Sequence, residues 1–115
     1  MSVDLASKVC IPCMGGIPPM TREEIAPLLA QVPGWEVLDN TKLFRSFTFP
    51  DWATAQAFVV AAGAIAEEAG HHPDLLLRWG EVRAEIYTHK IKGLAEADFI
   101  LAAKLSRLYD QQQPS

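Results

Sequence analysis

The chain has 115 residues, the length of one ordinary domain, and half of them are hydrophobic, which excludes a disordered chain. Ten Lys and Arg residues stand against 14 Asp and Glu, and the net charge of −4 argues against a protein that binds nucleic acid directly by bulk charge. The longest stretch without a charge, residues 52–66, is too short and too rich in alanine to span a bilayer, and no signal-peptide segment opens the chain, so we expect a cytoplasmic protein without membrane contact.

Residues 1–20 are rich in Pro and Gly and are predicted to form an N-terminal arm. The arm contains a single CxxC motif, made by Cys10 and Cys13. One such motif supplies two of the four ligands of a structural zinc site. A redox-active CxxC usually opens a helix that follows a strand, and no strand is predicted before this one. Three interpretations therefore remain open: two reduced thiols, a metal site completed by another chain, or a redox pair.

The first half of the domain is predicted to be a helix, two strands and a longer helix. Thr21 and Glu24 have the spacing of a capping box at the start of a helix that ends near Val32. Strands follow at 35–38 and 43–49; the second places Arg45 on its apolar face, where it could reach the edge or pair with a carboxylate. The long helix then begins after Asp51 as N-cap and ends at Gly70.

The second half is predicted to be a hairpin and a last helix. Strands at 75–79 and 82–89 flank a tight turn at Gly80-Glu81, and a helix runs from about 95 to 109. That helix has more apolar residues than one core-facing stripe needs. The excess fits either a broad contact with the sheet or a contact with another subunit, and the second interpretation rests on Ile100, Leu101, Leu105 and Leu108.

These elements predict an α+β fold, in which three helices pack on one face of a four-stranded antiparallel sheet. We expect one domain, residues 21–110, between the arm 1–20 and a tail 111–115. A domain this small gains stability from association, so an oligomer is expected.

The chain has three histidines, and the hairpin predicts that they meet. His71 and His72 precede its first strand and His89 ends its second, so all three should lie at the open end of the hairpin. Three imidazoles and a water can form a catalytic zinc centre, as in a zinc hydrolase. They can equally be metal-free acid–base groups, or histidines without a chemical role. Adjacent histidines are poor ligands for one metal, because neighbouring side chains diverge in extended structure.

The histidines belong to a longer pattern that resembles the signature of the pterin-4a-carbinolamine dehydratase family. The HHP motif alone has little specificity, but HHP with TH sixteen residues later and GLxxxD after that is specific. The resemblance covers residues 21–109. The matching residues are Glu67, His71, His72, Pro73, Trp79, Val82, Thr88, His89, Gly93, Leu94 and Asp98.

The resemblance implies a lyase that dehydrates a 4a-hydroxytetrahydropterin such as 4a-hydroxytetrahydrobiopterin to the quinonoid dihydropterin, without metal or other cofactor. This reaction recycles the pterin of aromatic amino acid hydroxylases. The resemblance also implies a homodimer or homotetramer. The alternative is a non-catalytic assembly or dimerisation protein on the same fold; such relatives tend to lose the histidines, so their retention here favours an enzyme.

The resemblance also assigns roles to residues. His71 and His89 would carry the proton transfers, with His72 as a third catalytic group that binds or orients the pterin, and Asp98 would orient His89. Trp35 is an additional candidate wall of the pterin pocket, or a core residue. Ala95 stands where members often have Ser or Thr as N-cap of the last helix, which Asp98 could compensate in part. The substrate-binding residues would be Glu67, His72, Pro73, Trp79 and Thr88.

Overall fold

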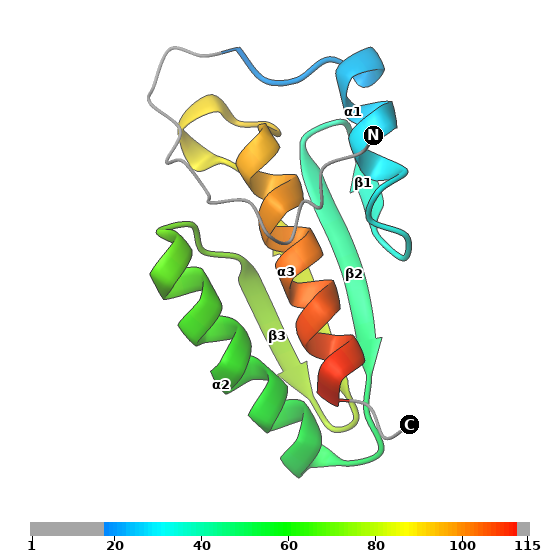
Figure 1. Cartoon of the computed structure of the whole chain (residues 1–115), viewed down its shortest axis with the longest axis vertical. Coiled ribbons are helices and arrows are strands. Elements are labelled where there is room, and N and C mark those ends of the chain that lie inside the picture. The colour runs from blue at the N-terminus through cyan, green and yellow to red at the C-terminus, as the bar shows by residue number, and fades with distance from the viewer. Residues whose placement is uncertain (1–17, 113–115) are drawn as a thin grey trace.

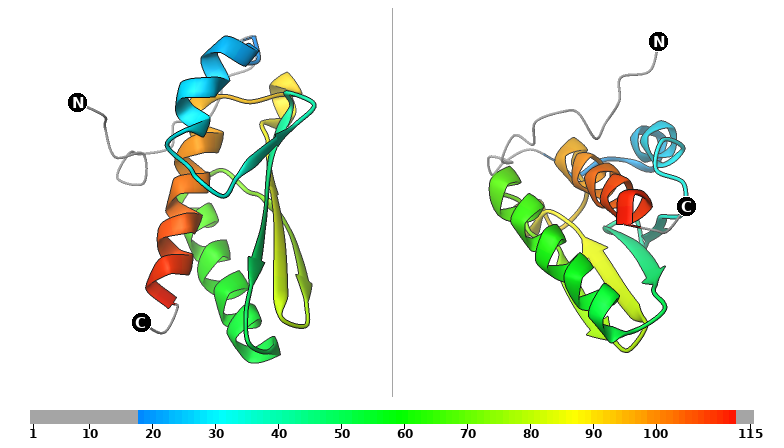
Figure 2. Two further views of the ribbon diagram at one scale, coloured as in Figure 1. Left: turned by 90° about the vertical axis from the view of Figure 1, so that its right-hand side faces the viewer. Right: turned by 60° about the horizontal axis from the view of Figure 1, so that its bottom comes forward.

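A computed structural model describes residues 18–112, which fold into a single antiparallel sheet covered by helices on one face (Figures 1 and 2). The strand order β1-β2-β4-β3 confirms the predicted α+β fold with a four-stranded antiparallel sheet. Most of the predicted arm and the end of the tail, with Cys10 and Cys13, lie outside the described residues. The elements are α1 (Arg22–Leu29), β1 (Glu36–Leu38), β2 (Lys42–Thr48), α2 (Trp52–Ala69), β3 (Asp74–Arg78), β4 (Glu81–Ile86), the 3-10 helix η2 (His89–Ile91) and α3 (Glu96–Gln112).

The core lies between the sheet and the helices, because alternate strand residues point to the helix-covered face. Large side chains from both layers interlock there, and Phe47 of β2 lies 4.8 Å from Phe58 of α2 between ring centroids. Their removal from water is the main stabilising contribution to the fold. The largest fully buried apolar side chains are Phe47, Phe58, Phe99, Leu43, Ile86, Leu94, Leu101, Leu105, Val32 and Val82.

Helix α3 lies centrally, between α1 and α2 and against the sheet (Figure 1). This position explains its excess of apolar residues, because α1, α2 and the sheet all cover α3 within the same chain. The side chains buried in this way include Ile100, Leu101 and Leu105. The burial of these three side chains favours the broad contact within the chain, while Leu108 is only partly buried against the core and the contact with another subunit stays a prediction. The exposed large apolar side chains of the helices lie on α2 instead, where Val60 is 69% and Trp52 44% exposed.

The ends of the helices follow the predicted signals. Thr21 and Glu24 form the complete capping box of α1, and the side chain of Asp51 accepts the backbone N–H of Thr54 at the start of α2. Gly70 ends α2 in the left-handed region, with φ of 68°, a conformation that costs other residues roughly 1–2 kcal/mol. The chain therefore turns sharply away from the helix axis directly before the histidine pair.

The hairpin differs from its prediction at both ends. Arg78 pairs with Glu81, so the turn is Trp79-Gly80 rather than Gly80-Glu81. The reason is that Gly80 takes the position with positive φ, 73°, inside the turn. Strand β4 ends at Ile86 instead of His89, because the chain closes a small loop in which Thr88 bridges to Gly93. Among residues 18–112, no helix has the length and apolar character needed to cross a membrane.

The N-cap of α2 predicts an acid-dependent loss of stability. The hydrogen bonds from Thr54, first its backbone N–H and then its hydroxyl, hold the pKa of Asp51 below its usual value. A carboxyl whose pKa is lower in the folded state stabilises the fold above the pKa of the unfolded chain, about 3.9, and this contribution disappears as the pH falls through the folded-state pKa. Asp51→Asn should therefore flatten the fall of the thermal unfolding midpoint between about pH 5 and 3.

Glu68→Gln provides the matched control, because it removes a carboxylate from the other end of α2 that accepts no hydrogen bond from the described residues. This variant should keep the slope of the unmodified protein. If Asp51→Asn and Glu68→Gln change the slope equally, the N-cap does not contribute to the acid sensitivity.

Candidate active site

A buried carboxylate joins the segments that carry the predicted site. Asp98, in the first turn of α3, is fully buried, and both of its oxygens are occupied. Its Oδ1 lies 2.5 Å from Nε2 of His71, and its Oδ2 accepts the hydroxyl of Thr88 and the backbone N–H of Ala95, both at 2.8 Å. One side chain thus ties together the end of α2, the end of β4 and the start of α3.

The contact with Ala95 also explains how α3 begins without a Ser or Thr N-cap. Ala95 precedes the first helical residue, Glu96, and Asp98 is the third residue of the helix. An acidic side chain at this position accepts the N-cap backbone N–H, which is one half of a capping box. The expected compensation by Asp98 is therefore present as a direct hydrogen bond.

Asp98 contacts a different histidine from the one we expected. We assigned it to His89, but its carboxylate lies against His71, whose side chain is 13% exposed. An ionised carboxylate only accepts hydrogen bonds, so Nε2 of His71 carries the proton and Nδ1 is the nitrogen with a free lone pair. The reason for the difference is the sharp turn at Gly70, which directs His71 toward the start of α3.

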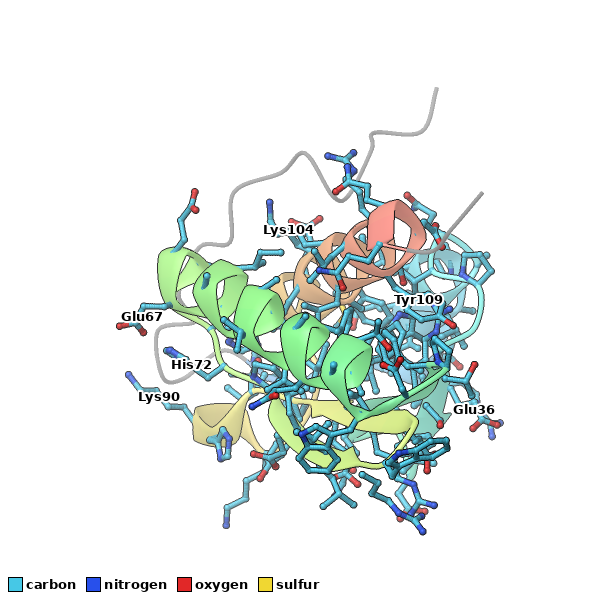
Figure 3. All side chains as sticks on the ribbon, turned by 90° about the horizontal axis from the view of Figure 1, so that it is seen from below. Glu36, Glu67, His72, Lys90, Lys104 and Tyr109 are labelled. Atoms are coloured by element: carbon cyan, nitrogen blue, oxygen red, sulfur yellow. The ribbon has the colours of Figure 1, made fainter. Side chains whose placement is uncertain are left out.

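His72 points away from this buried contact. Its Nε2 lies 2.8 Å from Oε1 of Glu67, and both side chains are largely exposed, at 61% and 82%. Figure 3 shows this pair at the edge of the molecule, with Lys90 projecting on the same side. An exposed pair of this kind contributes little to folding, so His72 and Glu67 are available to a ligand.

His89 is exposed and lies over an aromatic ring. Its imidazole is 4.2 Å from the ring of Tyr87 between centroids, at an interplanar angle of 37°. We did not predict a role for Tyr87. The sequence did offer a signal for this contact: Tyr87 and His89 are two residues apart, and residues with this spacing in an extended segment lie on the same face.

The open end of the hairpin therefore gathers most of the predicted site residues but does not join the three imidazoles at one point. Thr88 is buried beside His71, and Pro73 leads from His72 into β3. Among residues 18–112, no group of three or more His, Cys, Asp and Glu side chains is arranged to hold a metal ion.

The two predicted tryptophans lie elsewhere. Trp79 is in the turn of the hairpin and 71% exposed, roughly 20 Å along β3 from His72. Trp35 is buried, its ring packs edge-on against Phe47, and its Nε1 donates to Ser106. The structure therefore places neither indole beside the histidines of the same chain, and Trp35 is a core residue.

Comparison with known proteins places the same residues in one family. A family model described as pterin 4 alpha carbinolamine dehydratase matches residues 18–108. Proteins of Rubrobacter xylanophilus and Methylococcus capsulatus, provisionally named pterin-4-alpha-carbinolamine dehydratase, are each 50% identical over 105 residues. These alignments cover 91% of this chain and 98% of the Rubrobacter protein, and 90% and 92% for Methylococcus.

Two solved structures are similar to this fold. A transcriptional coactivator/pterin dehydratase from Brucella melitensis has a TM-score of 0.74 and 31% identity, over 78% of this chain and 97% of that one. A pterin dehydratase-like protein, identified as a RuBisCO assembly factor in the alpha-carboxysome, has a TM-score of 0.57 and 27% identity, over 66% and 89%.

The two histidine–carboxylate pairs predict losses of stability of different size. Asp98→Ala leaves the buried hydroxyl of Thr88 and the partly buried N–H of Ala95 without an acceptor, and a buried group in this state costs about 1–3 kcal/mol. Glu67→Ala removes an exposed partner and should cost about 0–1 kcal/mol. Urea denaturation of both variants beside the unmodified protein measures the difference, and equal losses would contradict the central role of Asp98.

Proposed function

The chain belongs to the pterin-4-alpha-carbinolamine dehydratase family, and on this premise we propose that it is a cytoplasmic hydro-lyase that dehydrates a 4a-hydroxytetrahydropterin to the quinonoid dihydropterin. The observation that carries the proposal is the contact of His71 with the buried Asp98, beside two exposed histidines. The reaction breaks the C4a–O bond, and the hydroxyl leaves as water. A proton must reach that hydroxyl and another must leave a ring nitrogen, which becomes doubly bonded to C4a.

His71 is suited to one of these transfers because its geometry is fixed. With Nε2 bound to Asp98, the neutral imidazole presents the lone pair of Nδ1, which can accept a proton from the substrate. The carboxylate holds the ring in one tautomer and stabilises the imidazolium that forms when Nδ1 takes a proton. In this role Asp98 is a positioning residue that acts through His71.

His89 is the candidate for the second transfer, since its imidazole is exposed and therefore accessible to a ligand at this end of the hairpin. His72 and Glu67 would bind or orient the pterin from the exposed side of the open end of the hairpin. Pro73 and the buried Thr88 would form the surface of the site between the histidines. The mechanism uses imidazoles alone and requires no metal or other cofactor.

The second candidate is a binding function on the same fold, favoured by the names of the two solved relatives, a coactivator/dehydratase and an assembly factor. This function predicts a stoichiometric complex with another protein that survives when all three histidines are replaced. The presence of His71, His72 and His89 favours the enzyme.

Stopped-flow dehydration of a 4a-hydroxytetrahydropterin tests the proposal, after subtraction of the rate without protein. One general acid or base contributes roughly 10²–10⁴-fold, so His71→Ala and His89→Ala should each lose activity in that range and the double variant more. His72→Ala should raise KM more than it lowers kcat. Activity should persist in EDTA.

Each histidine variant needs its thermal midpoint measured, because His71→Ala also leaves Asp98 with one partner fewer. A folded protein without activity above the background would refute the enzyme. If either single variant equals the double variant, the two histidines act as one unit, and the division of roles between them is wrong.

The same family membership leads us to propose a homodimer or homotetramer in solution. With the apolar side chains of α3 buried in the core, the exposed side of α2 around Val60 is the surface for association. Light scattering should give a multiple of 12.6 kDa, and Val60→Glu should lower the measured mass. A monomer at micromolar concentration would exclude the oligomer.

A further inference from the structure

A hollow of about 630 Å³ opens at the other end of α3 from Asp98. It lies between the turn after α1, strand β2 and the second half of α3. Its volume is within the range typical of small-molecule sites, roughly 300–1,000 Å³. Ser106, which lines it, is eight residues after Asp98, or about 12 Å along the helix, so the hollow is separate from the histidines.

The guanidinium of Arg45 forms one wall of this hollow. Arg45 lies on the helix-covered face of β2, and its Cζ is 4.5 Å from the ring centroid of Phe47 and 5.3 Å from that of Tyr109. Its NH1 donates to Oγ of Ser106 at 2.9 Å. The turn after α1 also presses against it, since a Cβ on Gly34 would come within 3.1 Å of Cζ.

This positive charge is partly buried, and none of residues 18–112 forms an ion pair with it. Burial lowers the pKa of Arg45 below its usual value and outweighs the opposite effects of Asp110 and Tyr109. A guanidinium in this position favours an anion that replaces its lost hydration.

Ser106 adds a second donor. Its Oγ accepts both NH1 of Arg45 and Nε1 of Trp35, each at 2.9 Å. With both lone pairs occupied, the hydroxyl hydrogen of Ser106 remains to be donated. The lining also includes Arg107 and the carboxylate of Asp110.

We propose that this hollow is a second ligand site, which binds a small oxyanion, a carboxylate or phosphate group, through Arg45 and Ser106. The planar guanidinium matches the two oxygens of such a group and is held in place by the rings beneath it. The carboxylate of Asp110 opposes the ligand and limits its affinity.

The indole N–H of Trp35 reports directly on the site, because it donates to the same Ser106 oxygen. The experiment titrates inorganic phosphate and, separately, malonate into the full chain at constant ionic strength and follows the three indole N–H signals by NMR. A saturable shift of the Trp35 signal is expected, while the exposed Trp52 and Trp79 serve as internal references. Tighter binding of phosphate than of malonate would indicate a phosphate site, and the reverse order would indicate a carboxylate site.

Three variants decide the outcome. Arg45→Gln should weaken binding roughly tenfold or more, and Asp110→Asn should strengthen it several-fold. Arg83→Gln makes the same charge change on the uncovered face of the sheet and should bind as the unmodified protein does.

The proposal is overturned if the Trp35 shift does not saturate, or if Arg45→Gln and Arg83→Gln bind equally. Should Arg45→Gln not fold, Asp110→Asn decides instead, because an unchanged affinity in that variant would also overturn the proposal.

Discussion

The carboxylate of Asp98 is the contact on which the site and part of the fold depend. It is fully buried and accepts hydrogen bonds from His71 after α2, Thr88 after β4 and Ala95 at the start of α3. A buried charge is tolerated only where such partners replace its hydration. Asp98 consequently holds together the start of α3, the end of β4 and the segment that follows α2. The same contacts fix the orientation of the His71 imidazole.

The remaining chemistry lies on the outside of this buried contact. His72 and Glu67 form an exposed pair, and His89 rests on the ring of Tyr87. These side chains are positioned by short local features, the turn at Gly70 and the loop closed between Thr88 and Gly93, and not by burial. The site therefore combines one immobilised imidazole with two that remain free to respond to a ligand.

Local patterns in the sequence predicted most of the fold. The capping box at Thr21, the N-cap at Asp51 and the alternation along β2 and β4 depend on residues close in sequence, and each is present as expected. The pairing of β3 with β4 also predicted that the segments with His71, His72 and His89 lie at the open end of the hairpin, although the three imidazoles do not meet at one point there.

The partner of Asp98 could not be predicted in this way. His71 and Asp98 are 27 residues apart, and their contact depends on the direction in which the chain leaves α2 and on the packing of α3. The apolar excess of α3 was ambiguous for a related reason, since a pattern along one helix does not reveal how many neighbours surround it. The position of Trp79 did follow from the predicted hairpin, which puts residue 79 beside the turn and the histidines at the open end; its assignment to the pterin site came from the resemblance alone.

The double role of Asp98 has a consequence for the interpretation of related sequences. A protein that lost the reaction but kept this fold would still need an acceptor for the buried hydroxyl of Thr88 and the partly buried N–H of Ala95, so folding alone is a reason to retain the aspartate. His72 and His89 satisfy no buried group among the described residues, so the fold by itself gives no comparable reason to retain them. If the proposed reaction is correct, the presence of these two histidines is the better sign of a catalyst on this fold, because Asp98 is needed by a scaffold as well.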